Sequence, residues 1–186
     1  MTREEAVAAM LDVLRDLDVP HMVVGSLASN YHGVPRSTQD ADLVAQLGDT
    51  SIRDVARCLG EHFRLQPQMA FETVTATTRY VFELLDAPFS IEIFSLSDDS
   101  YDRTRFGRRQ PATIEGRQTF VLTAEDVIIT KLRWAGQGDR RKDEEDVRNV
   151  IAVQHKRIDW GYVVEWCERH GTGNLLKRIR RSVPSI

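Results

Sequence analysis

Apolar residues recur at helical spacing in some stretches of the chain and in short continuous or alternating runs in others. Residues 3–17 place apolar side chains three to four positions apart, which predicts a helix, and Thr2 with Glu5 fits a capping box at its start. Residues 21–24 form an apolar run typical of a short buried strand. Further on, the pattern predicts helices at 27–32 and 50–63 and strands at 39–45, 71–85 (as one strand or a hairpin), 89–96 and 118–122.

The last third of the chain contains only helical patterns. Thr123 is a natural N-cap for a helix from 124 to about 135, which Gly136 and Gly138 interrupt. Helices from about 143 to 154 and from 160 to about 170 follow, and a basic, helical tail starts near 175. We therefore predict an α+β fold with a small mixed β-sheet flanked by helices in residues 1–122, and a C-terminal helical region, residues 123–186, packed on that core.

Composition places the protein among ordinary globular chains. Its 186 residues include 28% charged and 41% hydrophobic positions, and the formal net charge is −3. Cys58 and Cys167 have no metal-ligand or disulfide spacing, which favours reduced thiols. Since no apolar run approaches the roughly 20 residues of a membrane span, we expect a soluble, cytoplasmic protein with no membrane partner.

Basic residues gather in three short segments, within 103–109, at 140–142 and within 177–181. Such segments are typical of solvated surfaces and also of contacts with polyphosphate or RNA. The sequence leaves both readings open.

The clearest chemical signal is Asp40 and Asp42, two residues apart on a predicted strand. Side chains at this spacing share a face, with Cβ atoms about 6–7 Å apart. Carboxylates that close raise each other's pKa unless a cation satisfies them. Gly25 and Ser26 precede them at the turn into a helix, where backbone N–H groups favour phosphate. A divalent metal beside a phosphate site suggests nucleotide chemistry.

This combination, Gly-Ser followed by Asp-x-Asp, resembles the DNA polymerase β-like nucleotidyltransferase superfamily. Thirteen residues separate Ser26 from Asp40, a spacing slightly different from the commonest form. The resemblance implies that Asp40 and Asp42, with a third carboxylate, hold two Mg²⁺ ions, or Mn²⁺ in their place. It also implies that Ser26 binds the β- or γ-phosphate of an NTP, with Gly25 admitting close approach.

Glu92 is the predicted third carboxylate, as a metal ligand or as the general base for the acceptor hydroxyl. It alternates with two isoleucines on a predicted strand, so it lies on the face opposite the buried one. The toxin-like members of the family usually have Asp at this point, and Glu83 is the second choice. Arg36 and Thr38 could contact phosphate, or could be loop residues that solvate a turn.

A second motif lies in the helical part. Lys131-Leu-Arg-Trp-Ala135 and the later block containing Arg140, Lys142, Asp143 and Asp146 resemble the KLxA and RxKDxxD blocks of AbiEii-like nucleotidyltransferase toxins, the first one residue longer here. That resemblance implies catalytic roles for Lys131, Asp143 and Asp146. Lys131 would extend its ammonium into a cleft and bind phosphate. Asp143 and Asp146 would share a helix face, with helix capping as the alternative role.

The sequence thus predicts an NTP-dependent nucleotidyltransferase that moves NMP to an acceptor hydroxyl and releases pyrophosphate. The toxin resemblance implies the 3′ end of tRNA as acceptor and a cognate antitoxin as partner. Two alternatives remain. One is a small-molecule, antibiotic-type nucleotidyltransferase, against which the second block argues; the other is a non-catalytic scaffold that binds a nucleotide or a protein.

Overall fold

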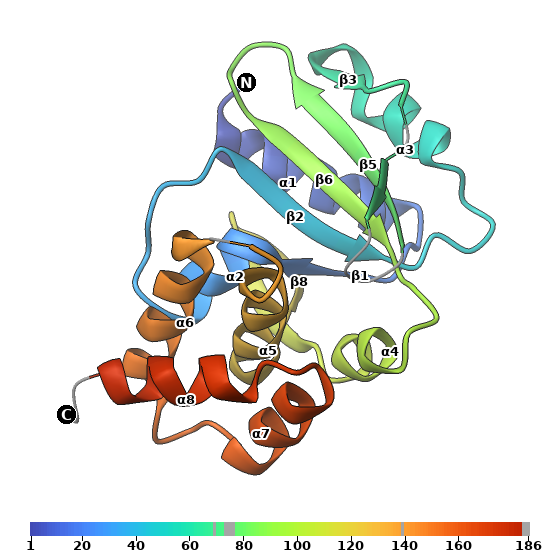
Figure 1. The fold of residues 1–186 in the computed structure, drawn as a ribbon. Coiled ribbons are helices and arrows are strands. Elements are labelled where there is room, and N and C mark those ends of the chain that lie inside the picture. Colours follow the sequence, from blue (N-terminus) through green and yellow to red (C-terminus); the bar gives the residue numbers. More distant parts are fainter. Residues whose placement is uncertain (69, 73–76, 139, 184–186) are drawn as a thin grey trace. The chain divides into compact units, whose positions relative to one another are not determined.

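A computed structural model describes the chain except residues 69, 73–76, 139 and 184–186 (Figure 1). The chain forms two compact units, one of residues 1–24 and 38–121 and the other of residues 25–37 and 122–186. The segment 25–37, which the sequence analysis assigns to the catalytic core, thus belongs to the second unit. Within the described residues, no helix has both the length and the apolar character needed to cross a membrane.

The first unit contains the strands and three helices. Its helices are α1 (Arg3–Asp16), α3 (Ile52–Leu59) and α4 (Ser100–Gly107), with a 3₁₀ turn at Gly60–His62. Its strands are β1 (His21–Val24), β2 (Asp40–Ala45), β3 (Phe63–Leu65), β4 (Ala70–Glu72), β5 (Thr77–Leu84), β6 (Ser90–Ser95), β7 (Gln110–Ile114) and β8 (Arg117–Val121).

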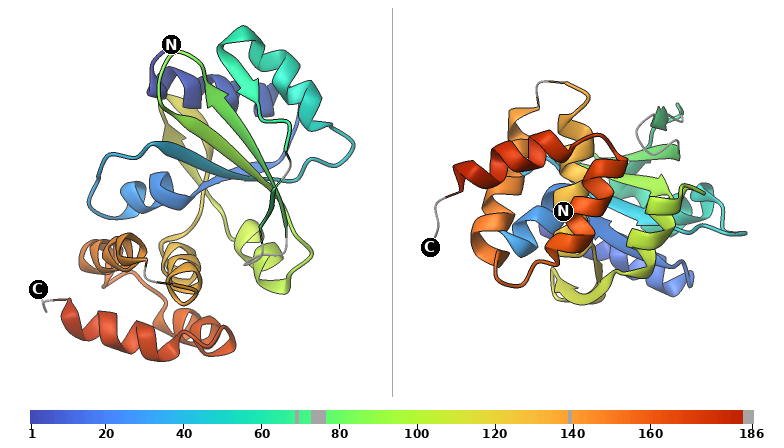
Figure 2. Two further views of the ribbon diagram at one scale, coloured as in Figure 1. Left: turned by 45° about the horizontal axis from the view of Figure 1, so that its top comes forward. Right: turned by 60° about the horizontal axis from the view of Figure 1, so that its bottom comes forward.

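These strands form one mixed sheet in the order β3-β5-β6-β2-β1-β8-β7, with β4 paired to β5. The β2–β6 and β1–β8 pairs are parallel and the others antiparallel. One face of the sheet is apolar, with Leu43, Ile91 and Ile93 no more than 1% exposed. Helices α1 and α3 contact each other and lie against the sheet (Figure 2). The predicted α+β class with a mixed sheet is confirmed.

Local signals explain most of these elements. Thr2 and Glu5 form the predicted capping box at α1. The helix predicted over 50–63 ends earlier, because Gly60 adopts a φ of +75° and the chain continues into β3. The segment 71–85 forms the predicted hairpin as β4 and β5, although its residues 73–76 lie outside the described part.

The sequence analysis missed α4 and β7. The apolar content of α4 is low, and its buried polar pair, Asp102 and Arg105, reads as a solvated segment. Strand β7 joins β8 through Glu115 and Gly116, both at positive φ. A two-residue turn of this kind is the usual hairpin connection, and the Glu-Gly pair was its signal.

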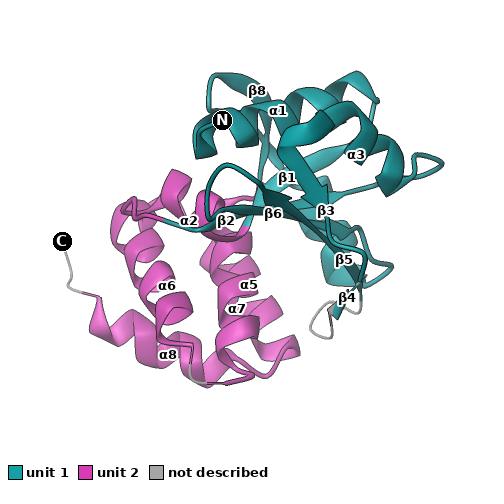
Figure 3. Cartoon of the chain, turned by 90° about the horizontal axis from the view of Figure 1, so that it is seen from above, with its two compact units in different colours: residues 1–24, 38–121 teal, residues 25–37, 122–186 magenta. Residues whose placement is uncertain are grey.

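The second unit is helical and contains α2 (Gly25–His32), α5 (Ala124–Ala135), α6 (Arg141–Gln154), α7 (Trp160–Arg169) and α8 (Gly173–Ser182) (Figure 3). Helix α2 contacts both α5 and α6. Its buried His32 bonds the Leu122 carbonyl at 2.7 Å through Nε2, and Gln154 donates to the His32 carbonyl at 3.0 Å. Burial lowers the pKa of His32 below its usual value.

Gly33 allows α2 and α6 to approach closely. A Cβ at this position would lie 3.0 Å from the Ser29 carbonyl oxygen and 3.1 Å from the Val150 nitrogen. Both are backbone atoms, so the contact cannot be relieved by a side-chain rotation. We expect Gly33→Ala to lower the free energy of unfolding by about 1–3 kcal/mol. Gly107→Ala, where nothing lies within 4 Å of the new Cβ, should leave stability unchanged or raise it slightly. Urea denaturation of both variants tests this, and equal effects would contradict it.

Candidate functional site

Parallel pairing of β2 with β6 brings the predicted carboxylates together. Asp42 is the register partner of Glu92, and Asp40 is the partner of Ser90. Residues in register on neighbouring strands point to the same face of a sheet, so the three acids share one face. All three are partly exposed, whereas Ala41 and Ile91 between them are fully buried. The first unit therefore presents three carboxylates on the face opposite its apolar core.

Two of these carboxylates have clear hydrogen-bond partners. Thr38 donates from its hydroxyl to Oδ1 of Asp40 at 2.6 Å. Arg79, on β5, donates to Oε2 of Glu92 at 3.0 Å. Burial raises the pKa of Glu92, Arg79 opposes that shift, and the charge of Asp40 adds to it. Thr38 thus lies in the site as a partner of Asp40, and Arg79 is a contributor that the sequence analysis missed.

The donor set suits a hard divalent cation, because carboxylate oxygens are the ligands that Mg²⁺ and Mn²⁺ prefer. Across the described ranges, however, no three His, Cys, Asp or Glu side chains stand close enough to hold one ion together. The carboxylate of Glu92 instead forms an ion pair with Arg79. A site with all three acids therefore requires Glu92 to exchange its guanidinium partner for the metal.

Glu83, the second choice for the third acid, is bound elsewhere. It is the register partner of Ser90 on β6, one strand further from Asp40. Its carboxylate accepts hydrogen bonds from Arg64 at 2.6 and 2.9 Å and from Gln66 at 2.7 Å. Of the two glutamates, Glu92 is the one in direct register with the Asp40–Asp42 strand.

The second unit contains a buried ionic network built from the other predicted residues. Lys131 on α5 is 9% exposed, and its ammonium lies 2.9 Å from both Asp143 and Asp146 on α6. Arg36 donates to both oxygens of Asp146, at 2.7 and 2.9 Å. Arg140 lies 2.9 Å from Oδ2 of Asp143, an oxygen that accepts no hydrogen bond from the described residues. Sequence segments more than 100 residues apart thus meet in one charge cluster.

The network changes how two predicted residues are understood. Helix α6 begins at Arg141 with Arg140 as its N-cap residue, so the capping alternative for Asp143 is wrong. The ammonium of Lys131 is held between the two aspartates. Burial would lower the pKa of Lys131, but the two carboxylates outweigh it and raise that pKa. Burial opposes ionisation of Asp146, yet Arg36 and Lys131 keep its pKa lowered.

Gly25 and Ser26 begin α2. Gly25 has a φ of +58°, a conformation that L side chains rarely adopt, which explains the glycine. Ser26 accepts a hydrogen bond from Arg36 at 3.3 Å. The backbone of Arg36 is fixed in turn by Asn30, whose amide exchanges two hydrogen bonds with it at 2.7 and 3.0 Å. Ser26 and Arg36 therefore belong to the same network as Lys131, which the sequence analysis did not foresee.

In two of the three basic segments, some of the arginines make contacts within the fold. Arg105 is 4% exposed and paired with Asp102 at 2.7 Å. Arg109 stacks on the rings of Phe106 and Phe120, with its guanidinium carbon 4.2 and 4.9 Å from their centroids. At 140–142, Arg140 stacks on Trp134. In the segment within 177–181, all four basic residues are exposed on α8.

The first unit thus has a mixed sheet with Asp-x-Asp on a central strand, and the chain has a Gly-Ser pair at the start of α2, features typical of the nucleotidyltransferase fold. The family model for nucleotidyltransferases of unknown function (DUF6036) matches residues 4–176. The chain therefore belongs to this family. No curated protein matches the sequence.

Solved structures with the same fold include several nucleotidyltransferases. The crystal structure of ANT(2″)-Ia in complex with adenylyl-2″-tobramycin superposes with a TM-score of 0.65 at 15% identity, covering 92% of this chain and 98% of that one. A nucleotidyltransferase-like protein from Paracoccidioides brasiliensis gives 0.60 at 16%, covering 97% and 91%. The lincosamide adenylyltransferase LnuA, bound to lincomycin, gives 0.58 at 11%, covering 82% and 98%. At these identities the likeness shows the fold.

Because Lys131 neutralises two buried carboxylates, we expect Lys131→Met to lower the free energy of unfolding by about 3 kcal/mol near neutral pH. The raised pKa of Lys131 means that its contribution is complete below its unfolded pKa and is lost as pH rises through the folded value. The difference between wild type and variant should therefore shrink above about pH 10.4. Urea denaturation across this pH range measures it.

Lys156→Met, at an exposed lysine of the same unit, is the matched control and should change stability by less than about 0.5 kcal/mol. The double variant Lys131→Met/Asp143→Asn should recover part of the loss, because it removes one of the two buried carboxylates that Lys131 neutralises. A Lys131→Met variant as stable as the Lys156→Met control would show that the network is not a stabilising one.

Proposed function

We propose that this protein is a metal-dependent nucleotidyltransferase that transfers NMP from an NTP to an acceptor hydroxyl. The observation that carries the proposal is the register of β2 with β6, which aligns Asp42 with Glu92 and places Asp40 on the same face. In the reaction, the acceptor oxygen bonds to the α-phosphorus and the bond to the pyrophosphate oxygen breaks. The hydroxyl proton is lost and pyrophosphate leaves.

Asp40, Asp42 and Glu92 would hold the divalent ions, Mg²⁺ or Mn²⁺. When bound, such ions neutralise phosphate charge and orient the reacting oxygens. Thr38 fixes the Asp40 carboxylate by its 2.6 Å hydrogen bond. Arg79 supplies the positive charge that Glu92 needs before a metal arrives, since two carboxylates in direct register otherwise repel each other.

The residues of the second unit take a supporting part in this proposal. Gly25 and Ser26 contact phosphate, and Arg36 is the cation that orients the Ser26 hydroxyl. Asp146 and Lys131 hold Arg36 in place through the buried network. Their role is thus to position Ser26 and Arg36, with Asp143 completing the charge balance around Lys131.

As acceptor we propose RNA, with the 3′ end of tRNA as the specific candidate. The blocks around Lys131 and Asp146 resemble those of AbiEii-like toxins, and the structure joins both blocks in one network. A toxin of this kind would have a cognate antitoxin as partner, and its NTP and tRNA would meet in the cytoplasm.

A small-molecule acceptor is the second candidate. It is favoured by the solved structures with adenylyl-tobramycin and with lincomycin, which share the fold over nearly their whole length. A non-catalytic scaffold is the third candidate. It is favoured because Glu92 is bound to Arg79 and because no three acids of the described residues lie close enough to hold one ion.

The test incubates the protein with total tRNA, Mg²⁺ and each α-labelled NTP in turn. Label should appear on tRNA with wild type and be absent with Asp40→Asn/Asp42→Asn. Glu92→Gln should lower the rate by about 100-fold or more, because a ligand or base is lost. Glu83→Gln is the matched control, one strand away on the same face, and should stay near the wild-type rate.

Each contrary result selects another account. A loss with Glu83→Gln but not with Glu92→Gln would reassign the third acid. NTP binding without label on tRNA would point to a small-molecule acceptor, to be tested with aminoglycosides and lincosamides. Absence of NTP binding would leave only the scaffold.

A further inference from the structure

Helix α8 carries a row of cations on its outward face. Its apolar side, Leu176 and Ile179, is at most 2% exposed, and its other face presents Lys177, Arg178 and Arg181 to solvent. Lys177 and Arg181 are four residues apart, so they lie on the same side of the helix, about 6 Å from each other, while Arg178 lies about 100° around it. Residues 173–182 contain no acid. In a chain of net charge −3, this is a marked local excess of positive charge.

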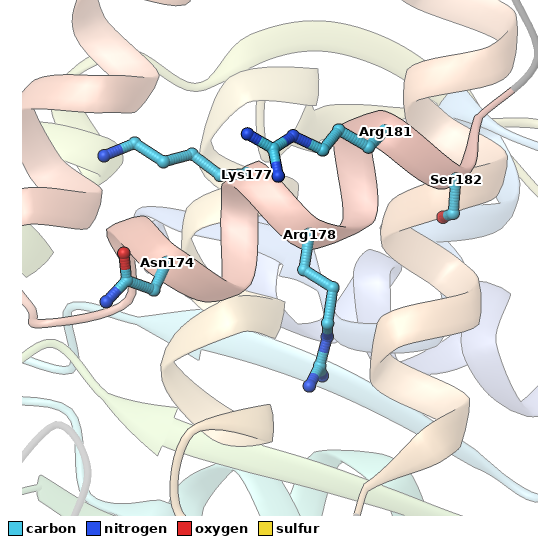
Figure 4. Close-up of a pocket in the computed structure, with 5 residues that line it drawn as sticks. All are labelled: Asn174, Lys177, Arg178, Arg181 and Ser182. Atoms are coloured by element: carbon cyan, nitrogen blue, oxygen red, sulfur yellow. The ribbon is translucent and has the colours of Figure 1, made fainter.

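A shallow pocket of about 480 Å³ follows this row of cations. Asn174, Lys177, Arg178, Arg181 and Ser182 line it, and all of them come from α8 (Figure 4). The lining thus offers an amide, a hydroxyl and three cations, which are donors suited to phosphate oxygens. The exposed lining contains no large apolar or aromatic side chain, so it suits neither an acyl chain nor a stacked base.

Neighbouring groups hold these cations in place without neutralising them all. Glu144 on α6 accepts from Arg178 at 2.7 Å and from Arg148 at 3.3 Å, while Arg148 also donates to Ser182 at 3.1 Å. One glutamate therefore anchors two arginines at the edge of the pocket. Lys177 lies 3.6 Å from Glu168, both well exposed, a pair of small energetic value that a phosphate can replace. Arg181 has no acidic partner among the described residues.

We infer that the solvent-facing side of α8 binds the phosphodiester backbone of RNA. Backbone contacts need exposed cations along an open surface, which is what α8 presents. The inference rests on the proposed function for the identity of its ligand, because an enzyme that modifies RNA ends must also hold the rest of the strand. It assigns that role to the third basic segment, whose purpose the sequence left open.

The experiment measures binding of fluorescein-labelled total tRNA by anisotropy at salt concentrations from about 50 to 200 mM. Lys177→Ala/Arg181→Ala should weaken binding on the order of tenfold near 100 mM salt and reduce the slope of log K against log salt by between about 1 and 2, since two phosphate contacts are lost. Arg53→Ala/Arg57→Ala is the matched control. It removes two exposed cations at the same i, i+4 spacing from α3 and should keep the wild-type slope.

Three outcomes overturn the inference: tRNA binding that is equal in both double variants, no tRNA binding by wild type, or binding of poly-glutamate in place of tRNA, which would indicate an acidic protein partner. The Asp40→Asn/Asp42→Asn variant separates this inference from the proposed function, because it should lose transfer and keep RNA binding. Label transfer that is unchanged in Lys177→Ala/Arg181→Ala would contradict the inference and leave the proposed enzyme activity standing. RNA binding through α8 without any transfer would support the inference and contradict the proposed enzyme activity.

Discussion

The three carboxylates of the first unit depend on one constraint, the register between the parallel strands β2 and β6. It aligns Asp42 with Glu92, and the alternation of a strand then puts Asp40 on the same face while Ala41 and Ile91 enter the core. A shift of one residue would bury the acids and expose the isoleucines, which the core does not permit. The same apolar packing that stabilises the sheet therefore also fixes the carboxylates.

Three carboxylates on one face repel each other, and neighbouring donors offset part of that repulsion. Arg79 binds Glu92, and Thr38 binds Asp40. In the second unit, two buried carboxylates are also neutralised by cations. Lys131 and Arg36 offset the charges of Asp143 and Asp146 in a buried network. The Glu92–Arg79 pair is partly exposed, whereas Lys131, Asp143 and Asp146 are buried.

Sequence patterns predicted the parts of the fold in which local and tertiary preferences agree. The predicted strands 21–24 and 39–45 have mostly apolar residues, and the helix from Ala124 to Ala135 has apolar residues at helical spacing and an N-cap at Thr123. Helix α4 was missed because Asp102 and Arg105, two charges that read as solvent-exposed, pair in the interior. The contacts of Arg36 with Asp146 and of Arg79 with Glu92 could not be predicted, since each joins positions that only the folded chain brings together. The pairing of Asp42 with Glu92 could be anticipated only as far as the family resemblance implied a third acid.

The central claim is that Asp40, Asp42 and Glu92 form a divalent-cation site once Glu92 leaves Arg79. The most direct test is titration of Mn²⁺ followed by electron paramagnetic resonance, which needs no substrate or turnover. We predict saturable Mn²⁺ binding by wild type without nucleotide, weakened by Glu92→Gln and abolished by Asp40→Asn/Asp42→Asn. Mn²⁺ binding that is the same in all three proteins, or absent from wild type, would contradict it.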